Sequence, residues 1–287
     1  MHYARKFLWP LAPILALTLA GNATITWTTI DYPGAVRTEA NGINNNGDIV
    51  GYYQDAVNFN FHGFLLSGGV FTTIDFPGAD WTNAEGINDA GDIVGTYSIS
   101  SNPFAPIGFI SHNGVMRSFR VPGRSYTSVH GINNNGDIVG ESQLHTGTIG
   151  FVWKRGYGLT RIVAPGAAST SVRGINNSGD IVGYFDNGGL GAQARGFVLH
   201  DGIWQILHLS LSEETWAQGV NDNHQVAGTA LQVGSFYKGF AIYNDDLLIV
   251  GRTPSDFVSV MGINNNADMV GWFYDNNSVF HGFVRTR

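Results

Sequence analysis

Short runs of β-branched and aromatic residues alternate along this chain with turns rich in glycine and asparagine. Residues 38–44 form the first run of one unit, and Asn45-Asn46-Gly47 follows it as a tight hairpin turn, since Asn and Gly tolerate positive φ. Residues 48–53 are a second run, residues 62–66 a third and residues 70–75 a fourth. The pattern predicts four short antiparallel strands in this unit.

The unit recurs six times, and its signature in the first copy is Gly42-Ile-Asn-Asn-Asn-Gly-Asp-Ile-Val-Gly51. The copies begin at Gly42, Gly86, Gly131, Gly174, Gly219 and Gly262, so that successive starts lie 44, 45, 43, 45 and 43 residues apart. Four antiparallel strands at such a period are typical of a propeller blade. We therefore predict an all-β, six-bladed β-propeller over residues 24–287, with blades at about 38–75, 82–119, 127–163, 170–207, 215–250 and 258–286.

The last unit lacks a fourth strand, because the chain stops after the third run at His281-Gly-Phe-Val284. Residues 25–31 match residues 71–75, which form the fourth strand of the first unit. We predict that this N-terminal strand completes the last blade and closes the ring. The alternative is an open solenoid, which would require capping repeats that the sequence does not display.

Residues 1–23 stand outside the repeat. Arg5 and Lys6 precede an apolar run over residues 7–20, and small residues follow up to Ala23. This order is typical of a secretory signal peptide, and the apolar run is too short for a membrane span. We expect an extracellular or periplasmic protein with no membrane span after cleavage. An uncleaved anchor or a buried helix is the alternative, against which Pro10 and Pro13 argue.

The composition narrows the function classes. The 22 acidic residues against 15 basic ones give a net charge of −7, which disfavours nucleic acid and anionic membrane surfaces as partners. The chain contains no Cys, which excludes disulfides, cysteine-ligated metals and thiol catalysis. A domain without such crosslinks must be held together by its hydrophobic core.

The repeats resemble a known family. The Gly-Ile-Asn-x-x-Gly-Asp-Ile-Val-Gly signature, followed about 20 residues later by His62-Gly-Phe or His281-Gly-Phe, is similar to the HAF-type extracellular repeat, although other residues replace the histidine in the remaining four units. The resemblance covers all six units. It implies a secreted or cell-surface bacterial protein of unknown role, and it brings no catalytic residue with it.

The turns also invite a calcium interpretation, because they are rich in asparagine and aspartate. Five copies carry one Asp after the turn, at Asp48, Asp92, Asp137, Asp180 and Asp268, and the second copy adds Asp89. The fifth copy has Gln225 at that position and carries Asp222 instead. A hard dication requires several carboxylates among six to eight ligands. Hairpin chemistry is therefore the favoured interpretation, and we predict no metal site and no cofactor.

Candidate functional residues are those at which the copies differ. The residue before the opening glycine varies widely, and so does the residue two positions earlier. On the innermost strands these positions would form a ring around the central channel, whereas the alternative is that they are tolerant edge positions. The predicted ligand-binding ring contains Asn41, Glu85, His130, Arg173, Gln218 and Glu39, with Trp81 and Trp216 as exposed aromatic rings able to stack on sugars.

No nucleophile or acid–base motif stands out, so we expect a non-catalytic binding or scaffold module whose ligand is a glycan or a cell-surface protein. The alternative is a lyase or glycosidase at the channel mouth, with Glu85 as acid or base and with His130 and Arg173 as partners. A structural envelope protein is the third possibility.

Overall fold

The computed structural model describes residues 25–287 apart from residues 100–104, 145–146, 190, 210–211, 233–236, 245 and 252–256. The predicted signal peptide, residues 1–23, lies outside the described residues.

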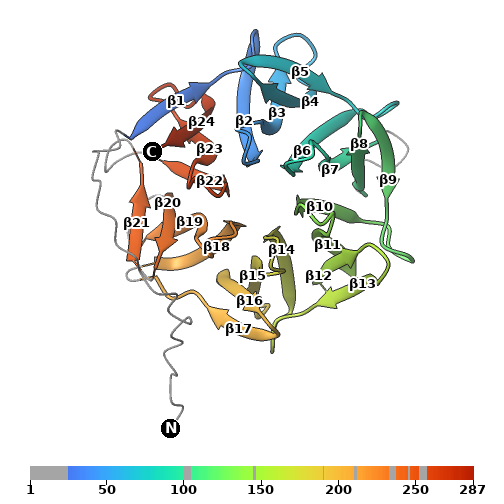
Figure 1. Cartoon of the computed structure of the whole chain (residues 1–287), viewed down its shortest axis with the longest axis vertical. Coiled ribbons are helices and arrows are strands. Elements are labelled where there is room, and N and C mark those ends of the chain that lie inside the picture. The colour runs from blue at the N-terminus through green and yellow to red at the C-terminus, as the bar shows by residue number, and fades with distance from the viewer. Residues whose placement is uncertain are drawn as a thin grey trace.

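Six four-stranded antiparallel sheets are arranged in a ring around a central axis (Figure 1). The prediction of a six-bladed propeller is confirmed. Blade 1 contains β2 (Ala35–Ile43), β3 (Ile49–Asp55), β4 (Phe61–Ser67) and β5 (Val70–Ile74), and blade 2 contains β6 (Trp81–Ile87), β7 (Ile93–Ser98), β8 (Ile107–His112) and β9 (Val115–Phe119). Blade 3 contains β10 (Thr127–Ile132), β11 (Ile138–Leu144), β12 (Gly147–Lys154) and β13 (Gly158–Ile162).

The remaining blades follow the same order from the axis outward. Blade 4 contains β14 (Ser169–Ile175), β15 (Ile181–Asp186), β16 (Arg195–His200) and β17 (Ile203–Ile206). Blade 5 contains β18 (Ser212–Val220), β19 (Val226–Gln232), β20 (Tyr237–Tyr243) and β21 (Asp246–Val250). Blade 6 contains β22 (Val258–Ile263), β23 (Met269–Tyr274) and β24 (Phe280–Thr286), and its outermost strand is β1 (Thr26–Ile30) from the N-terminal end of the propeller.

The ring closes through β1, as predicted. This strand pairs with β24 from Thr26 opposite Thr286 to Ile30 opposite Gly282. The Trp27 ring stacks on Phe283 with centroids 4.2 Å apart, and Ile30 is buried. The last blade is therefore built from both ends of the described chain.

The hydrophobic core lies between blades. Each third strand contributes one fully buried phenylalanine, in the order Phe64, Phe109, Phe151, Phe197, Phe240 and Phe283. A glycine on the second strand faces each ring, and a Cβ added at Gly51 would lie 2.9 Å from the Phe64 ring. Glycine at this position leaves space for the phenylalanine, which explains why the two residues recur together.

Each innermost strand contains a β-bulge just before the opening glycine of its signature, which the sequence pattern does not predict, and β2 and β18 contain a second register shift near their start. In blade 1 the register between β2 and β3 shifts between Ala40 and Gly42, so that Asn41 is the extra residue. The other five blades shift at the equivalent residue. Bulges redirect a side chain away from the regular pleat, and here the redirected residue is the variable one before each opening glycine.

The glycine after each bulge allows the innermost strands to approach one another. A Cβ added at Gly86 would lie 2.9 Å from the His130 carbonyl oxygen and 3.2 Å from the Gly131 Cα. Equivalent close approaches link all six glycines around the axis, and Gly262 returns to Gly42. The repeated glycine is required for this backbone contact.

The signature turns are hairpins, although the positive φ is limited to one residue. In blade 1, Asn44 N–H donates to the Asp48 carbonyl at 3.1 Å, and Gly47 has φ of 83°. Asn45 and Asn46 are not in the positive-φ region, contrary to the conformational argument made from sequence. The glycine position is occupied by His224 (φ 58°) in blade 5 and by Ala267 (φ 63°) in blade 6.

Candidate functional site

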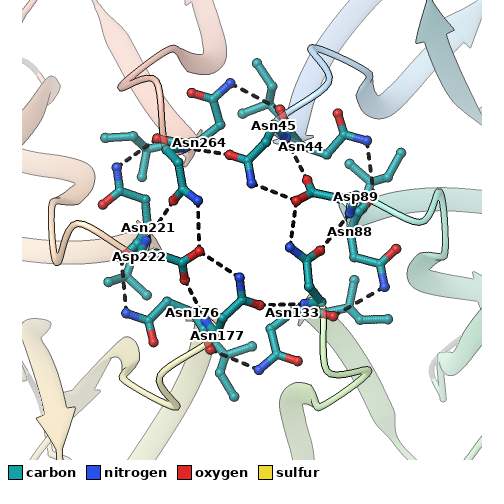
Figure 2. Close-up of a pocket in the computed structure, with 18 residues that line it drawn as sticks. Asn44, Asn45, Asn88, Asp89, Asn133, Asn176, Asn177, Asn221, Asp222 and Asn264 are labelled. Carbon is teal, nitrogen blue, oxygen red and sulfur yellow. Dashed lines mark hydrogen bonds between the residues drawn. The ribbon is translucent and has the colours of Figure 1, made fainter.

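One end of the channel is lined by a circle of asparagines that joins all six blades (Figure 2). The Nδ2 atom of the first Asn in each turn donates to the carbonyl oxygen of its equivalent in the next blade at 2.8–3.3 Å, and Asn264 returns to Asn44. The members are Asn44, Asn88, Asn133, Asn176, Asn221 and Asn264. The same side chains accept hydrogen bonds from their own turns, so each residue forms the hairpin and also links the blade to its neighbour.

A second circle lies beside the first. The backbone N–H of each following residue donates to the side-chain Oδ1 of its equivalent in the next blade at 2.7–2.8 Å. The members are Asn45, Asp89, Asn134, Asn177, Asp222 and Asn265. The two aspartates belong to blades 2 and 5, and each accepts two asparagine amides on Oδ2.

These hydrogen bonds favour a structural role for the turns over calcium binding. Burial works against ionisation of Asp89, but the N–H groups of Asn45 and Asn134 outweigh it and lower the pKa of the carboxyl. The oxygens that would bind a cation already accept N–H donors around a cavity of about 100 Å³. Within the described residues, no group of three or more His, Cys, Asp or Glu is placed to hold a metal ion.

The predicted ring residues occupy the bulges of the innermost strands. Glu85, His130, Arg173 and Gln218 are half-buried there, whereas Asn41 is buried and donates from Nδ2 to the Ala84 carbonyl at 3.0 Å. The Asn41 amide therefore connects blades 1 and 2 within the channel wall.

His130 and Arg173 belong to one polar cluster on blades 3 and 4. The Arg173 guanidinium donates to His130 Nδ1 at 3.2 Å and to the Tyr184 hydroxyl at 2.7 Å. Because a guanidinium can only donate, His130 Nδ1 accepts and a neutral ring carries its proton on Nε2. That nitrogen lies 3.8 Å from Glu141 Oε1, which also accepts from the Tyr126 hydroxyl at 3.2 Å.

Glu141, Tyr126 and Tyr184 were not predicted as site residues. Glu141 is opposite Ser128 and Tyr184 is opposite Ser171, each on the second strand of its blade. The sequence carries a signal for Glu141 and Tyr184, since the second-strand residue after the last glycine of the signature also varies among the six copies.

The titratable groups of the cluster differ in charge at neutral pH because their surroundings differ. Burial opposes ionisation of Glu141, but the Arg173 charge and the His130 contact outweigh it, so the pKa of this carboxyl lies well below its usual range. Burial and the Arg173 charge lower the pKa of His130. At neutral pH the cluster therefore contains an ionised Glu141, a cationic Arg173 and a neutral imidazole.

Glu85 is the opposite case. Burial raises its pKa to about 8, and the carboxylates of Glu39 and Glu141 oppose the attraction of Arg173. These three charges belong to blades 1, 3 and 4, and they act together on a blade 2 side chain because it lies near the axis. No described residue donates a hydrogen bond to the Glu85 carboxyl. The structure thus brings Glu85, His130 and Arg173 into one neighbourhood of the channel.

Four buried polar atoms of this wall make no hydrogen bond to a described residue, namely Asn83 Oδ1, His130 Nε2, Ser171 Oγ and Arg173 Nε. An unsatisfied buried polar atom costs about 1–3 kcal/mol. Such costs are unusual enough to require an explanation at each position. Their concentration on β6, β10 and β14 marks this part of the channel as unlike the rest of the scaffold.

Half-buried aromatic rings form a continuous series of contacts that begins on the innermost strand β18 and extends to the second and third strands of blade 6. Trp216 on β18 contacts Tyr237 with ring centroids 5.4 Å apart, and the contacts continue through Phe257 at 5.0 Å and Trp272 at 5.3 Å to Phe280 at 5.3 Å. We call this set the aromatic seam. It extends over blades 5 and 6.

The seam ends at blade 1, where the Arg37 guanidinium lies 3.5 Å from the Phe280 ring centroid. Arg37 also forms an ion pair with Glu39, the predicted ring residue of blade 1. Burial raises the pKa of Glu39, and the Arg37 charge limits the rise. Glu39 is thus a paired, buried residue between the seam and the polar cluster.

Trp81, the remaining predicted residue, is placed differently. It begins β6 at the crossing from blade 1 to blade 2, four residues before Glu85. Its side chain is half-buried there. Trp81 therefore lies away from the ring at the bulges.

No family model and no curated protein matches the chain. Solved structures share its fold. AofleA from Arthrobotrys oligospora is 13% identical with a TM-score of 0.56, over 92% of this chain and 87% of that one. The Aleuria aurantia lectin in complex with α-methyl-L-fucoside is 12% identical with a TM-score of 0.52, over 90% of this chain and 93% of that one.

A catalytically inactive virginiamycin B lyase from Staphylococcus aureus, with quinupristin, is 10% identical with a TM-score of 0.50, over 92% of this chain and 100% of that one. At these identities the likeness concerns the fold alone. The described part of the chain contains no helix long and apolar enough to span a membrane.

Proposed function

We propose that this protein is a carbohydrate-binding propeller whose ligand lies at the channel end remote from the asparagine circles. The observation that carries the proposal is the two-sided wall of that channel. The polar cluster with its unpartnered buried atoms covers blades 2–4, and the aromatic seam covers blades 5 and 6.

A sugar ring matches both sides of this wall. Its C–H face packs on aromatic rings, and its hydroxyl groups donate and accept hydrogen bonds. The charges of Arg173 and Glu141 compensate each other, while Glu85 and His130 are largely neutral at pH 7. A neutral polar ligand therefore suits this site better than a strongly charged one.

The comparisons support the proposal at the level of the fold. A lectin is among the similar propellers, and its structure contains α-methyl-L-fucoside. That ligand belongs to the Aleuria protein, and the present chain is only 12% identical to it.

Binding of the purified protein to a glycan array tests the proposal, with titration of the best ligand afterwards. We expect Trp216→Ala and Arg173→Ala to weaken binding by at least about tenfold, because each removes a desolvated contact from the site. Trp204→Ala removes an equally large ring that packs on Phe197 in the outer half of blade 4, and it should leave affinity unchanged. An array with no binding, or equal losses of affinity in all three variants, would contradict the proposal. Capture of a cell-surface protein in place of a glycan would replace the glycan with a protein as the ligand of this site.

Glu85 and Glu141 favour a second candidate, a lyase or glycosidase acting on the bound sugar. Two carboxyl groups with pKa values held far apart are the requirement for a general acid beside an ionised group. We expect Glu85→Gln to abolish turnover of an array-identified glycan and to preserve binding. Wild-type activity that falls as pH rises through about 8 would agree with Glu85 acting as the acid.

We also propose that the protein is exported and that its units belong with HAF-type extracellular repeats. Residues 1–23 carry the signal-like pattern that supports export. Expression of the full gene product followed by mass measurement of the released protein tests this. A mature N-terminus at residue 24 is expected, and retention of the uncleaved chain inside the cell would overturn it.

A further inference from the structure

A separate cavity of about 390 Å³ lies at the junction of blades 1 and 2. The β3–β4 loop contributes Asn60, β4 contributes His62, and the crossing segment contributes Asp75, Asp80 and the Pro77-Gly78 turn. Trp81 completes the wall as the first residue of β6. The residues of the polar cluster do not line it. Its size falls within the range of small-molecule sites.

His62 is fixed inside this junction by two carboxylates. Its Nδ1 lies 2.9 Å from Asp75 Oδ2, and its Nε2 lies 3.4 Å from Asp55 Oδ2. Asp55 is itself held by the loop, because the backbone N–H groups of Asn58, Val57 and Asn60 donate to its carboxylate. These hydrogen bonds lower the pKa of Asp55. The polar side of the cavity is therefore preorganised.

Trp81 provides the apolar side. Its side chain is half-buried, and it makes no ring contact with any aromatic residue in the described part of the chain. By contrast, Trp216 and Trp272 contact neighbouring rings of the aromatic seam. Trp81 thus lines the cavity with a side chain that no other aromatic ring of the described residues contacts.

The junction of blades 6 and 1 repeats the His–Asp arrangement and serves as an internal comparison. His281 Nδ1 lies 2.7 Å from Asp31 Oδ1, and His281 Nε2 lies 3.7 Å from Asp275 Oδ2. Val36 and Arg37 stand there at the positions of Asp80 and Trp81. Arg37 is engaged with Glu39 and the Phe280 ring. The His–Asp pair is therefore a shared connection between strand and crossing, whereas Trp81 and Asp80 distinguish the first junction.

From this difference we infer that the junction of blades 1 and 2 is a second saccharide site, which binds one pyranose ring against Trp81. The ring's C–H face packs on the indole, and adjacent hydroxyl groups donate to the Asp75 carboxylate, whose side chain is 47% exposed. Asp55, Asp75 and Asp80 disfavour an anionic ligand. A purely apolar ligand would displace water from the exposed Asp75 carboxylate without offering it a hydrogen-bond donor.

Ligand-detected saturation-transfer NMR on the full purified chain tests the site. The probes are the methyl pyranosides of glucose, galactose, mannose, fucose and N-acetylglucosamine. The measurements are made on the wild type and in a Trp216→Ala background, which separates this site from the channel site. Binding here should persist in that background, so failure of the channel proposal and failure of this one are distinguishable.

At least one pyranoside should bind. Trp81→Ala and Asp75→Asn should raise its Kd by about tenfold or more, while Trp81→Phe keeps most of the affinity. Asp31→Asn is the matched control, because it changes the same hydrogen bond at the other junction, and its Kd should stay within about twofold of the wild type. If Trp81→Ala does not fold, the comparison of Asp75→Asn with Asp31→Asn decides.

Three results would overturn the inference. The first is that no pyranoside binds. The second is that Asp75→Asn and Asp31→Asn weaken binding equally, which would assign both pairs a purely structural role. The third is binding of methylguanidine with no pyranoside binding, which would make the cavity a site for cationic groups.

Discussion

Two glutamates in one channel wall show how far the surroundings set the chemistry of a residue. Glu141 forms an ion pair with Arg173, accepts a hydrogen bond from a tyrosine hydroxyl and stays ionised. Glu85 accepts no hydrogen bond from a described residue, and burial raises its pKa to about 8. Neither state is visible in the sequence. The variable positions could be found because the copies differ, but the environment of Glu85 depends on residues from three other blades and that of Glu141 on Arg173 of blade 4.

Glu85→Gln should change the pH dependence of stability. The pKa of Glu85 is raised in the folded state, so the folded protein binds more protons than the unfolded chain and stability falls as pH rises from about 4.5 to 8. Because Gln carries no ionisable proton, the variant does not show this loss of stability over this pH range. Relative to wild type, we expect the variant to gain at least about 1.4 kcal/mol in unfolding free energy between pH 5 and pH 9, since one pKa unit has that value. Urea unfolding at both pH values measures it, and parallel curves for the two proteins would contradict it.

Asp180 provides a second pH effect at the opposite end of the channel. Its carboxylate contacts His200 of its own blade and His224 of blade 5 at 2.6 Å. The hydrogen bond to Asp180 raises the pKa of His200 above 6.5, and contacts with the histidines and Asn176 outweigh burial to lower the pKa of Asp180 below 3.8. The stabilisation that the Asp180–His200 contact gives is thus complete between pH 3.8 and pH 6.5. It is lost as pH rises through the raised pKa of His200 or falls through the lowered pKa of Asp180.

The variant His200→Gln should therefore destabilise the protein at pH 5 and have little effect at pH 9. Thermal unfolding at the two pH values checks this. The control is His112→Gln, which removes a more exposed histidine from its aspartate in blade 2, with a side chain 69% exposed, and should show a smaller effect. Equal shifts at both pH values would argue against the ionic contribution.

At the scale of the element, the strands were predictable and the bulges were not. β-Branched runs and turn residues indicated four strands per unit, and the observed bounds in blade 1 agree within a few residues. A bulge leaves no mark in that pattern, because the extra residue resembles any other strand residue. The repeated glycine after each bulge was visible, but its cause is backbone contact between different blades.

Gly86→Ala tests this contact. A methyl group would meet the His130 carbonyl oxygen at 2.9 Å, and backbone atoms cannot move aside without displacing blade 3. We expect a loss of at least about 2 kcal/mol in unfolding free energy. Gly68→Ala is the control, because its φ is +56° and no atom lies within 4 Å of the added Cβ, so only backbone strain of about 1 kcal/mol applies. Guanidinium unfolding of both variants gives the comparison.

At the scale of the whole molecule, the number of blades and the closure followed from the period and from the incomplete last unit. The two asparagine circles could not be predicted in the same way, because asparagine in a turn is already explained by the hairpin. Only the assembled ring shows that Asn44 donates to Asn88 of the next blade and that Asn264 returns to Asn44.

Removal of β1 tests the closure. A chain starting at residue 32 loses the Trp27–Phe283 stack and the buried Ile30, and it exposes the edge of β24. We expect a loss of at least about 3 kcal/mol and a fall of roughly 6–12 °C in Tm, compared with the chain from residue 24. Increased aggregation should accompany it, since an open strand edge pairs with other chains. An unchanged Tm would show that the pairing of β1 with β24 is dispensable.

The same pairing has a consequence for biosynthesis. The ribosome makes β1 before every other strand of the propeller, so β1 has no partner in its own sheet until the other five blades have been made. Contacts between such distant segments form slowly. If the protein is exported as proposed, a chain that cannot close its propeller early would remain unfolded enough to pass through a translocation pore. The strands β1 and β24 would then pair only after export.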